Sequence, residues 1–250
     1  MDSLPSEYRP LAERRTSVPR IILIGGGSSS GKSFLTREVL SRLGEGGITH
    51  LTLDDYYKDQ TSMSMEERLK VNYDHPRAFD WKLMREQVAE LKQGKTVQKP
   101  IYDFVERNRS KKSETIIPQK LIVIEGIMAL VDRQLREMGD LRVFISASAE
   151  RRFLRRLIRD SEQRGREFEN IVHQYFTTVQ PMYEEVVKPS SNYADLIINN
   201  DGVENLALDV LTLLFQKELD LASLGQTDPK AEEEEFKEEV LSTVFQRRGK

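Results

Sequence analysis

Cysteine is absent from the 250 residues of the chain, and histidine is scarce. Without cysteine the chain has no disulfide, no thiolate nucleophile and no Cys-based zinc site. The three histidines, at positions 50, 75 and 173, are too scattered to form a ligand cluster of familiar spacing. These absences exclude thiol chemistry and the common zinc-site patterns.

Long apolar runs and an excess of basic charge are absent too. The longest apolar stretch, 121–131, is interrupted by Glu125 and is far shorter than the ~20 residues that cross a bilayer. The first ten residues, MDSLPSEYRP, are acidic and proline-broken, unlike a signal peptide. A net charge of -3 argues against nucleic-acid binding. We therefore expect a soluble, cytoplasmic protein with neither a membrane nor a nucleic-acid partner.

The length allows one large domain, or one domain with a small lobe, to bury a substantial core. Residues 1–19 hold three prolines among charges and predict a flexible arm. Residues 20–222 predict the folded domain. Residues 223–250 predict a linker followed by an acidic amphipathic helix. This helix could dock on another surface or form an oligomer contact, and it could equally be a mobile tail.

Short β-branched apolar runs alternate with helical patterns along 20–222. The run at 21–24 is continuous, which is typical of a strand buried on both faces of a parallel sheet. The alternation predicts an α/β fold with an open parallel sheet flanked by helices. Strands are expected at 21–24, 48–53, 121–124, 141–145 and 196–198, and helices at 33–43, 81–92, 128–137, 150–163, 168–187 and 203–221.

One insert interrupts this alternation. Residues 95–119 contain two short β-rich pieces around a basic loop, which predicts a hairpin rather than a crossover. Such a hairpin lobe could cover a site.

A glycine-rich segment follows the first strand and precedes the first helix. It fits the pattern G-x-x-x-x-G-K-[ST] of a phosphate-binding loop, and its flanks support that interpretation over a plain glycine turn. Lys32 would reach the β- and γ-phosphates, and the Ser33 hydroxyl would ligate Mg²⁺. We expect ATP or GTP and Mg²⁺ as cofactors. The nucleotide-binding residues are Gly26, Gly27, Ser28, Ser29, Ser30, Gly31, Lys32 and Ser33.

The phosphate loop alone does not separate kinases from ATPases, GTPases and sensors. Asp54, Asp55 and Glu125 lie at or just beyond the carboxyl ends of predicted strands, where open α/β sheets bind ligands. A kinase needs a carboxylate that accepts the proton of the attacking hydroxyl, and Asp54 is well placed for that role. Glu125 is better placed to hold Mg²⁺. The alternative is that these residues lie in solvated turns.

Seven arginines occur between Arg151 and Arg166. Four of them fall on one helix face opposite an apolar face, which predicts that the apolar face packs on the sheet and the arginines face a common space. Because the chain already has a phosphate loop, the transferring phosphoryl group is the simplest anion for these arginines to bind. The alternative is that the arginine face is solvated or forms structural ion pairs. The four are Arg152, Arg155, Arg156 and Arg159, and the apolar residues are Phe153, Leu154, Leu157 and Ile158.

Together these segments resemble the uridine kinase (uridine-cytidine kinase) family of P-loop kinases over about 20–214. The resemblance implies ATP- or GTP-dependent phosphorylation of the 5'-hydroxyl of a pyrimidine ribonucleoside. If Arg107 lines the base pocket, its donor-only guanidinium favours uridine over cytidine as the acceptor. The resemblance also implies Mg²⁺ and a homo-oligomer, often a tetramer. The matching segments are GGSSSGKS at 26, LTLDDYYK at 51, NYDHPRAFDW at 72, PIYDF at 100, IVIEGI at 122, RRLIRDSEQRGREFENIVHQY at 155 and YADLIINN at 193.

Position by position, the resemblance implies specific roles. Asp54 resembles the catalytic base, and together with Ser33 and Glu125 it forms the metal site. Lys32, Arg156 and Arg159 resemble the groups that act on the phosphates. The acceptor pocket would comprise Asp74 and Arg166 at the ribose hydroxyls and Tyr57, Tyr102, Phe104 and Gln174 around the nucleoside.

The chain departs from the family pattern in two places. Arg107 stands where the family has His or Tyr at the pyrimidine edge, and Ile145–Ser148 replaces a strand end that usually carries aspartates. An arginine there could favour an anionic acceptor. Arg107 could equally belong to a solvated basic loop. The alternatives are therefore a kinase of another small hydroxyl compound, such as a phosphorylated sugar, or a non-catalytic nucleotide-binding regulator.

Overall fold

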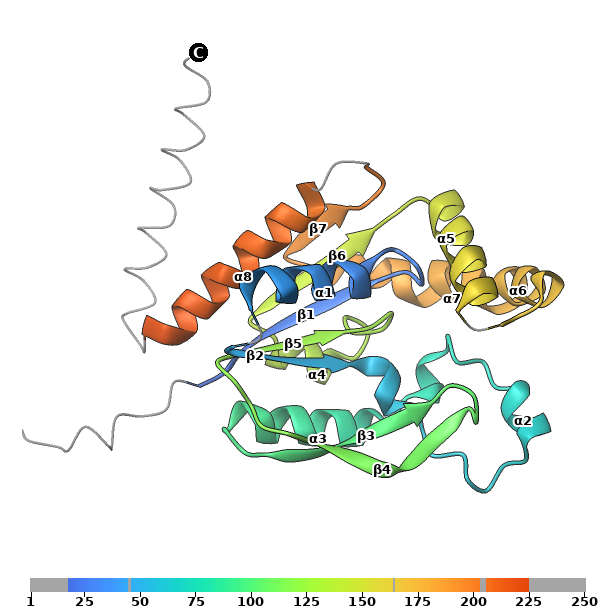
Figure 1. Cartoon of the computed structure of the whole chain (residues 1–250), viewed down its shortest axis with the longest axis horizontal. Coiled ribbons are helices and arrows are strands. Elements are labelled where there is room, and N and C mark those ends of the chain that lie inside the picture. Colours follow the sequence, from blue (N-terminus) through green and yellow to red (C-terminus); the bar gives the residue numbers. More distant parts are fainter. Residues whose placement is uncertain (1–17, 45, 164, 203–205, 225–250) are drawn as a thin grey trace, which may run out of the picture.

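A five-stranded sheet forms the centre of the protein, with the strands in the order β2-β5-β1-β6-β7 and every neighbouring pair parallel (Figure 1). This computed structural model describes residues 18–44, 46–163, 165–202 and 206–224. The predicted α/β class and parallel sheet are confirmed. The strands are β1 (Arg20–Gly26), β2 (Ile48–Thr52), β5 (Leu121–Glu125), β6 (Leu141–Ser146) and β7 (Leu196–Asn199).

Helices cover both faces of the sheet, which explains why the run 21–24 of β1 is apolar throughout. Ile21 and Leu23 contribute to the core on one face, and Ile22 and Ile24 to the core on the other. All four are fully buried, as expected for a central parallel strand. The first face is covered by α3 (Trp81–Lys92) and α4 (Arg133–Met138), and the second by α1 (Lys32–Leu43) and α8 (Leu206–Leu224) (Figure 1).

The predicted hairpin lobe is present as a separate antiparallel pair, β3 (Val97–Asp103) and β4 (Asn108–Ile116). It lies beside α3 (Figure 1), and its residues Val97, Tyr102 and Ile116 join the core on that side. The short helix α2 (Met65–Leu69) and the 3-10 turns Leu53–Tyr56 and Pro76–Ala78 are elements that the pattern did not predict.

A long helical stretch follows β6. It comprises α5 (Ala149–Glu162), α6 (Phe168–Gln174) and α7 (Gln180–Met182), with π-helical turns at Tyr175–Val179 and Tyr183–Val187 and a 3-10 segment at Lys188–Tyr193. The helices expected at 150–163 and 168–187 are therefore confirmed, although the second contains π turns. No helix in the described ranges is long and apolar enough to cross a membrane.

Two structural expectations are wrong. The helix expected from 128 begins only at Arg133, because Asp132 caps it by accepting a hydrogen bond from Leu135 N at 2.8 Å. The apolar face of α5 does not pack on the sheet: Leu154 and Ile158 are 56% and 49% exposed. The arginine face is the more buried one, because its cations find partners inside the protein. The arm at 1–17 and the tail at 225–250 lie outside the described residues.

Candidate active site

A cavity of about 460 Å³ opens at the carboxyl ends of β1, β2 and β5, between the phosphate loop, α5 and the hairpin lobe. The structure brings nearly all the predicted site residues to its wall. Gly26, Gly27 and Ser30 are the exceptions and do not line it. The predicted residues that do are Ser28, Ser29, Gly31, Lys32, Ser33, Asp54, Tyr57, Asp74, Tyr102, Phe104, Arg107, Glu125, Arg156, Arg159, Arg166 and Gln174.

The phosphate loop leads from β1 into α1. Lys32 is buried, and its Nζ donates to the carbonyl oxygens of Gly26 at 2.9 Å and Gly27 at 2.8 Å. Burial lowers the pKa of Lys32 to about 8, against the opposing effect of Glu125 and Asp54. The amine therefore lies beside both candidate acidic groups while it is bonded to its own loop.

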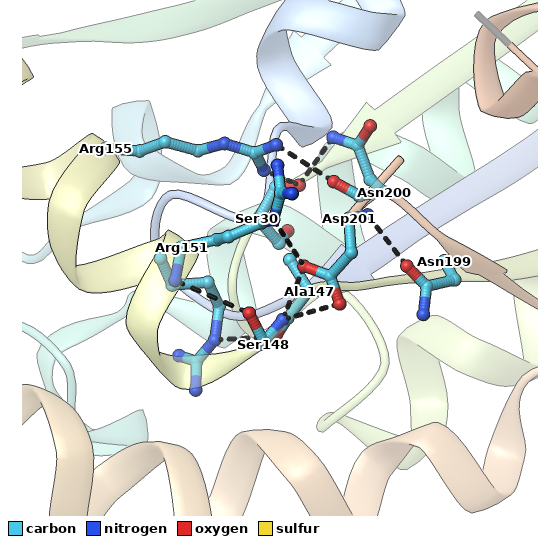
Figure 2. Close-up of polar contacts among 9 residues, drawn as sticks. Ser30, Ala147, Ser148, Arg151, Arg155, Asn199, Asn200 and Asp201 are labelled. Carbon is cyan, nitrogen blue, oxygen red and sulfur yellow. Dashed lines mark hydrogen bonds and ion pairs between the residues drawn. The ribbon is translucent and has the colours of Figure 1, made fainter. Parts of the chain in front are cut away.

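The far side of the phosphate loop is bound to the loop after β7, as Figure 2 shows. Asn200 Nδ2 and Arg155 Nη1 both donate to the Ser30 carbonyl, at 2.8 Å and 3.3 Å. Gly31, at φ 100°, passes so close to Asn200 that a Cβ atom would lie 2.1 Å from Nδ2. Glycine is required at Gly31 for both reasons. The sequence contained the segment YADLIINN, but its pattern carried no sign of this contact.

Arg152 is a buried cation that supports the same loop from behind. Its guanidinium stacks 3.5 Å from the centroid of the Tyr183 ring, and its Nε donates to the Ala147 carbonyl at 3.1 Å. A Cβ atom on Gly27 would lie 2.8 Å from its Nη1. The sequence placed Arg152 with the phosphate-facing arginines, whereas the structure puts it outside the cavity wall.

The acidic candidates come from neighbouring strands. Asp54 lies in the 3-10 turn that follows β2, and Glu125 ends β5, where it is paired in register with Thr52. Burial alone would raise the pKa of Glu125, but His50, Lys32 and Ser33 together hold that pKa below its usual value. Asp54 is close enough to Lys32 to raise the pKa of the amine.

The donor groups Ser33, Asp54 and Glu125 fit a magnesium ion. All three line the cavity beside the phosphate loop, and they offer one hydroxyl and two carboxylates, the oxygen ligands that Mg²⁺ prefers. The described part of the chain has no group of three or more His, Cys, Asp or Glu residues able to hold a metal. Mg²⁺ does not require one, because it usually takes one or two carboxylates and completes its shell with phosphates and water.

One fully buried carboxylate, Asp160, organises the arginine wall. It lies 2.7 Å from Arg159 Nη2, 3.3 Å from Arg166 Nη1 and 3.6 Å from Arg156 Nε. Arg156 also donates to Gln174 Oε1 at 2.8 Å and to Ser28 Oγ of the phosphate loop at 2.9 Å. Asp160 therefore offsets part of the repulsion among three cations, and Arg156 connects the phosphate loop to the opposite end of the cavity.

That opposite end is aromatic with polar groups at its edge. The rings of Tyr57 and Tyr102 lie with centroids 5.0 Å apart, and Tyr102 packs edge-on against Phe104 at 5.3 Å. Burial raises the pKa of Asp74, although the charges of Arg156 and Arg159 oppose the rise. Arg107 lines this end from the turn between β3 and β4, where its φ is 50°.

The family model described as "Phosphoribulokinase / Uridine kinase family" matches residues 21–207. The chain belongs to this family. Kinases of this kind transfer a phosphoryl group to a hydroxyl, so the chain is a nucleotide-binding P-loop kinase with an alcohol group as acceptor. The resemblance inferred from the motifs is confirmed, and the non-catalytic alternative loses its support.

Individual members of the phosphoribulokinase / uridine kinase family match most of the chain. A protein named "Uridine kinase" from Deinococcus deserti is 43% identical over 194 residues, which cover 78% of this chain and 94% of that protein. Another of the same name from Macrococcus caseolyticus is 42% identical over 196 residues, covering 78% and 95%.

Solved structures support the fold. Phosphoribulokinase from Rhodobacter spheroides superposes with a TM-score of 0.61 at 12% identity, covering 83% of this chain and all of that one. D-glycerate 3-kinase from Cryptococcus neoformans superposes with a TM-score of 0.54 at 17% identity, covering 72% and 86%. At such low identity the likeness shows a shared P-loop kinase fold and nothing more.

Proposed function

We propose that this kinase phosphorylates the 5'-hydroxyl of a pyrimidine ribonucleoside, uridine in preference to cytidine, with ATP or GTP and Mg²⁺. One observation carries the proposal: a single cavity has the phosphate loop at one end, an aromatic pocket at the other and Asp54 on the wall that both share. The relatives named uridine kinase support the nucleoside as acceptor.

On the donor side, the phosphate loop and Lys32 bind the triphosphate. Ser33 and Glu125, with Asp54, would hold Mg²⁺, which neutralises charge on the phosphate oxygens when it is bound. Arg156 and Arg159 face the same space from α5. Guanidinium groups there stabilise the negative charge that develops on the phosphoryl oxygens during transfer.

On the acceptor side, Asp74 and Arg166 offer an acceptor and a forked donor to the vicinal ribose hydroxyls. Gln174 presents its carbonyl to Arg156 and Arg166 and so fixes both guanidiniums. The base would lie among Tyr57, Tyr102 and Phe104, with Arg107 at its edge. This pose directs the 5'-hydroxyl toward Asp54, which accepts its proton as the new P–O bond forms.

The direct test is nucleoside triphosphate consumption with a panel of acceptors at fixed Mg²⁺. Uridine should be phosphorylated, 5'-deoxyuridine should be inert because it lacks the attacking hydroxyl, and 2'-deoxyuridine should react poorly because it lacks half of the diol. Turnover of 5'-deoxyuridine, or none with any nucleoside, would refute the proposal.

A second candidate is a kinase of a phosphorylated sugar, which the cationic side chains of Arg107 and Arg166 at the acceptor end favour. Sugar phosphates in the same panel separate the two candidates.

We also propose that residues 20–222 form the catalytic domain and that the protein is a cytoplasmic homo-oligomer. The resemblance to the uridine kinase family implies a tetramer. Light scattering of the purified chain tests the assembly.

A further inference from the structure

Lys99 is a buried lysine that no part of the proposed chemistry uses. It lies in β3 with its side chain 8% exposed and forms ion pairs with Asp55 and Glu114. Glu114, on the facing strand, is 54% exposed, whereas Asp55 is 13% exposed and approaches from the interior. Neither Lys99 nor Asp55 lines the cavity. A buried lysine is costly unless it is paired, so this pair is an unusual feature of the lobe.

The Asp55 carboxylate makes a second contact with the same strand. Its Oδ1 accepts a hydrogen bond from Tyr102 N at 3.3 Å, while its Oδ2 pairs with Lys99. Between these two contacts the hairpin register shifts, at Pro100 to Tyr102. Irregularities of this kind re-aim side chains beside active sites. Here one carboxylate spans the irregularity and holds the strand on both sides of it.

The two residues that follow Asp55 in the chain are connected to the hairpin lobe as well. Tyr56 OH donates to Gln87 Oε1 at 2.9 Å, and Gln87 Nε2 donates to the carbonyl of Gln98 in β3 at 2.8 Å. The carbonyl of Tyr57 accepts from Arg109 Nε of β4 at 2.7 Å. Three consecutive residues after Asp54, two in its turn and one directly behind it, are therefore bound, directly or through Gln87, to the lobe that carries Tyr102.

We propose that Lys99 is a positioning residue that, through Asp55, sets the separation between the Asp54 carboxylate and the Tyr102 ring. Asp54 precedes Asp55 in the chain, and Tyr102 donates to Asp55 through its own amide, so the pair locates both sides of the acceptor pocket at once. The lobe and the turn then move as one body, instead of the lobe closing on its own. The kinetic part of this proposal rests on the proposed nucleoside kinase function.

The test compares Lys99→Met, Asp55→Asn/Lys99→Met and Lys188→Met. The first leaves Asp55 buried without its cation, and the second removes both charges but keeps an amide oxygen for Tyr102 N. Lys188 is the matched control, because it pairs with Glu184 on the surface, where both side chains are more than half exposed.

For Lys99→Met we expect the kcat/KM for uridine to fall by about tenfold or more, while the KM for the nucleotide changes less than about twofold. The double variant should recover most of the loss, and Lys188→Met should match the wild type. An effect of Lys99→Met no larger than that of Lys188→Met, or equal losses for both substrates, would overturn the proposal.

Hydrogen exchange supplies a measurement that needs no substrate. In Lys99→Met, exchange should accelerate together over residues 53–57 and 98–104, and stay unchanged over 20–43. Uniform acceleration would mean general destabilisation, and no change would mean no coupling; both contradict the proposal. If the wild type phosphorylates no nucleoside, the proposed function fails, and hydrogen exchange still decides whether Lys99 couples the lobe to the turn.

Discussion

The Nζ of Lys32 donates a hydrogen bond to the carbonyl oxygen of Gly26 at 2.9 Å, so the lysine of the phosphate loop is folded back onto the strand that precedes it. Gly27 accepts a second bond at 2.8 Å. Two neutral carbonyls compensate a buried ammonium only in part, which agrees with the lowered pKa of about 8. A bound triphosphate would replace these partners with formal negative charge.

This geometry predicts a pH dependence of nucleotide affinity. The triphosphate favours charged Lys32, so binding raises the pKa of the amine above its value of about 8 in the free protein. Affinity should therefore be constant just below pH 8 and fall by up to tenfold per pH unit above it. Calorimetric titration from pH 7.5 to 9.5 measures the slope. Lys32→Ala should bind more weakly and show no such slope, and a wild-type affinity independent of pH would contradict the expectation.

Lys32→Ala should abolish phosphoryl transfer without unfolding the protein. The side chain serves the nucleotide, and its loss removes a charge that is costly to bury, so the melting temperature should stay level or rise. Thermal melts alongside turnover test this. A drop in stability comparable to that of a core deletion such as Leu23→Ala, at a fully buried position, would point to a structural role.

Asp54→Asn should leave nucleotide binding intact and reduce turnover by ~10² to 10⁴-fold, the usual effect of losing a general base. The asparagine keeps the shape of the side chain but cannot accept the hydroxyl proton. Single-turnover kinetics together with nucleotide binding separate the two effects. Unchanged turnover would remove Asp54 from the mechanism.

The adjacent Asp55 is a poor control for that experiment, although sequence position suggests it. Asp55 pairs with the buried Lys99 and accepts from Tyr102 N, so its replacement would disturb the pocket by another route. Glu86→Gln is the better control: Glu86 lies on α3, 58% exposed, 3.8 Å from Lys82. It should leave turnover unchanged.

Local patterns predicted the framework of the site well. The run at 21–24, the phosphate-loop spacing and the acidic residues at strand ends each depend on neighbours in sequence, and the parallel sheet then brings these ends together. Glu125 and Thr52 are paired in register across β5 and β2. Two carboxylates predicted from separate strands therefore meet at one cavity.

Contacts between distant segments could not be predicted in this way. The bond from Asn200 to Ser30 joins residues 170 positions apart, and Lys99 reaches Asp55 across 44. The prediction of which face of α5 is buried was wrong for a related reason. The pattern identified the two faces correctly, but hydropathy favours burial of Leu154 over burial of Arg156. Asp160, Ser28 and Gln174 reverse that preference by supplying partners for the cation.

A truncation before Gly225 should leave turnover largely intact, because the family match ends at residue 207 and the cavity residues all precede it. A truncation after Gly202 is the contrasting variant. It removes α8, whose Leu211 and Phe215 are fully buried against the sheet, and should fail to fold. Circular dichroism and turnover check both chains. A folded but inactive chain ending at Leu224 would show that the tail completes the site.

Arg107→His tests what selects the acceptor. Arg107 lines the aromatic end of the cavity, near enough to Arg166 for its charge to help lower the pKa of that guanidinium, after the larger effect of burial. A guanidinium only donates hydrogen bonds, so it can satisfy the O2 or O4 of uracil but opposes the amino group of cytosine.

The wild type should therefore turn over uridine faster than cytidine, and Arg107→His should narrow that ratio, because imidazole can donate or accept. Steady-state kcat/KM for both nucleosides measures the ratio. Lys112→His is the matched control: it makes a similar change on β4 of the same hairpin, at an exposed position, and should leave the ratio unchanged. A wild-type preference for cytidine would show that Arg107 does not select the base. The same uridine-to-cytidine ratio of kcat/KM in all three proteins would show this too. Poor turnover of both nucleosides with rapid turnover of a sugar phosphate would instead indicate that Arg107 and Arg166 bind an anionic acceptor.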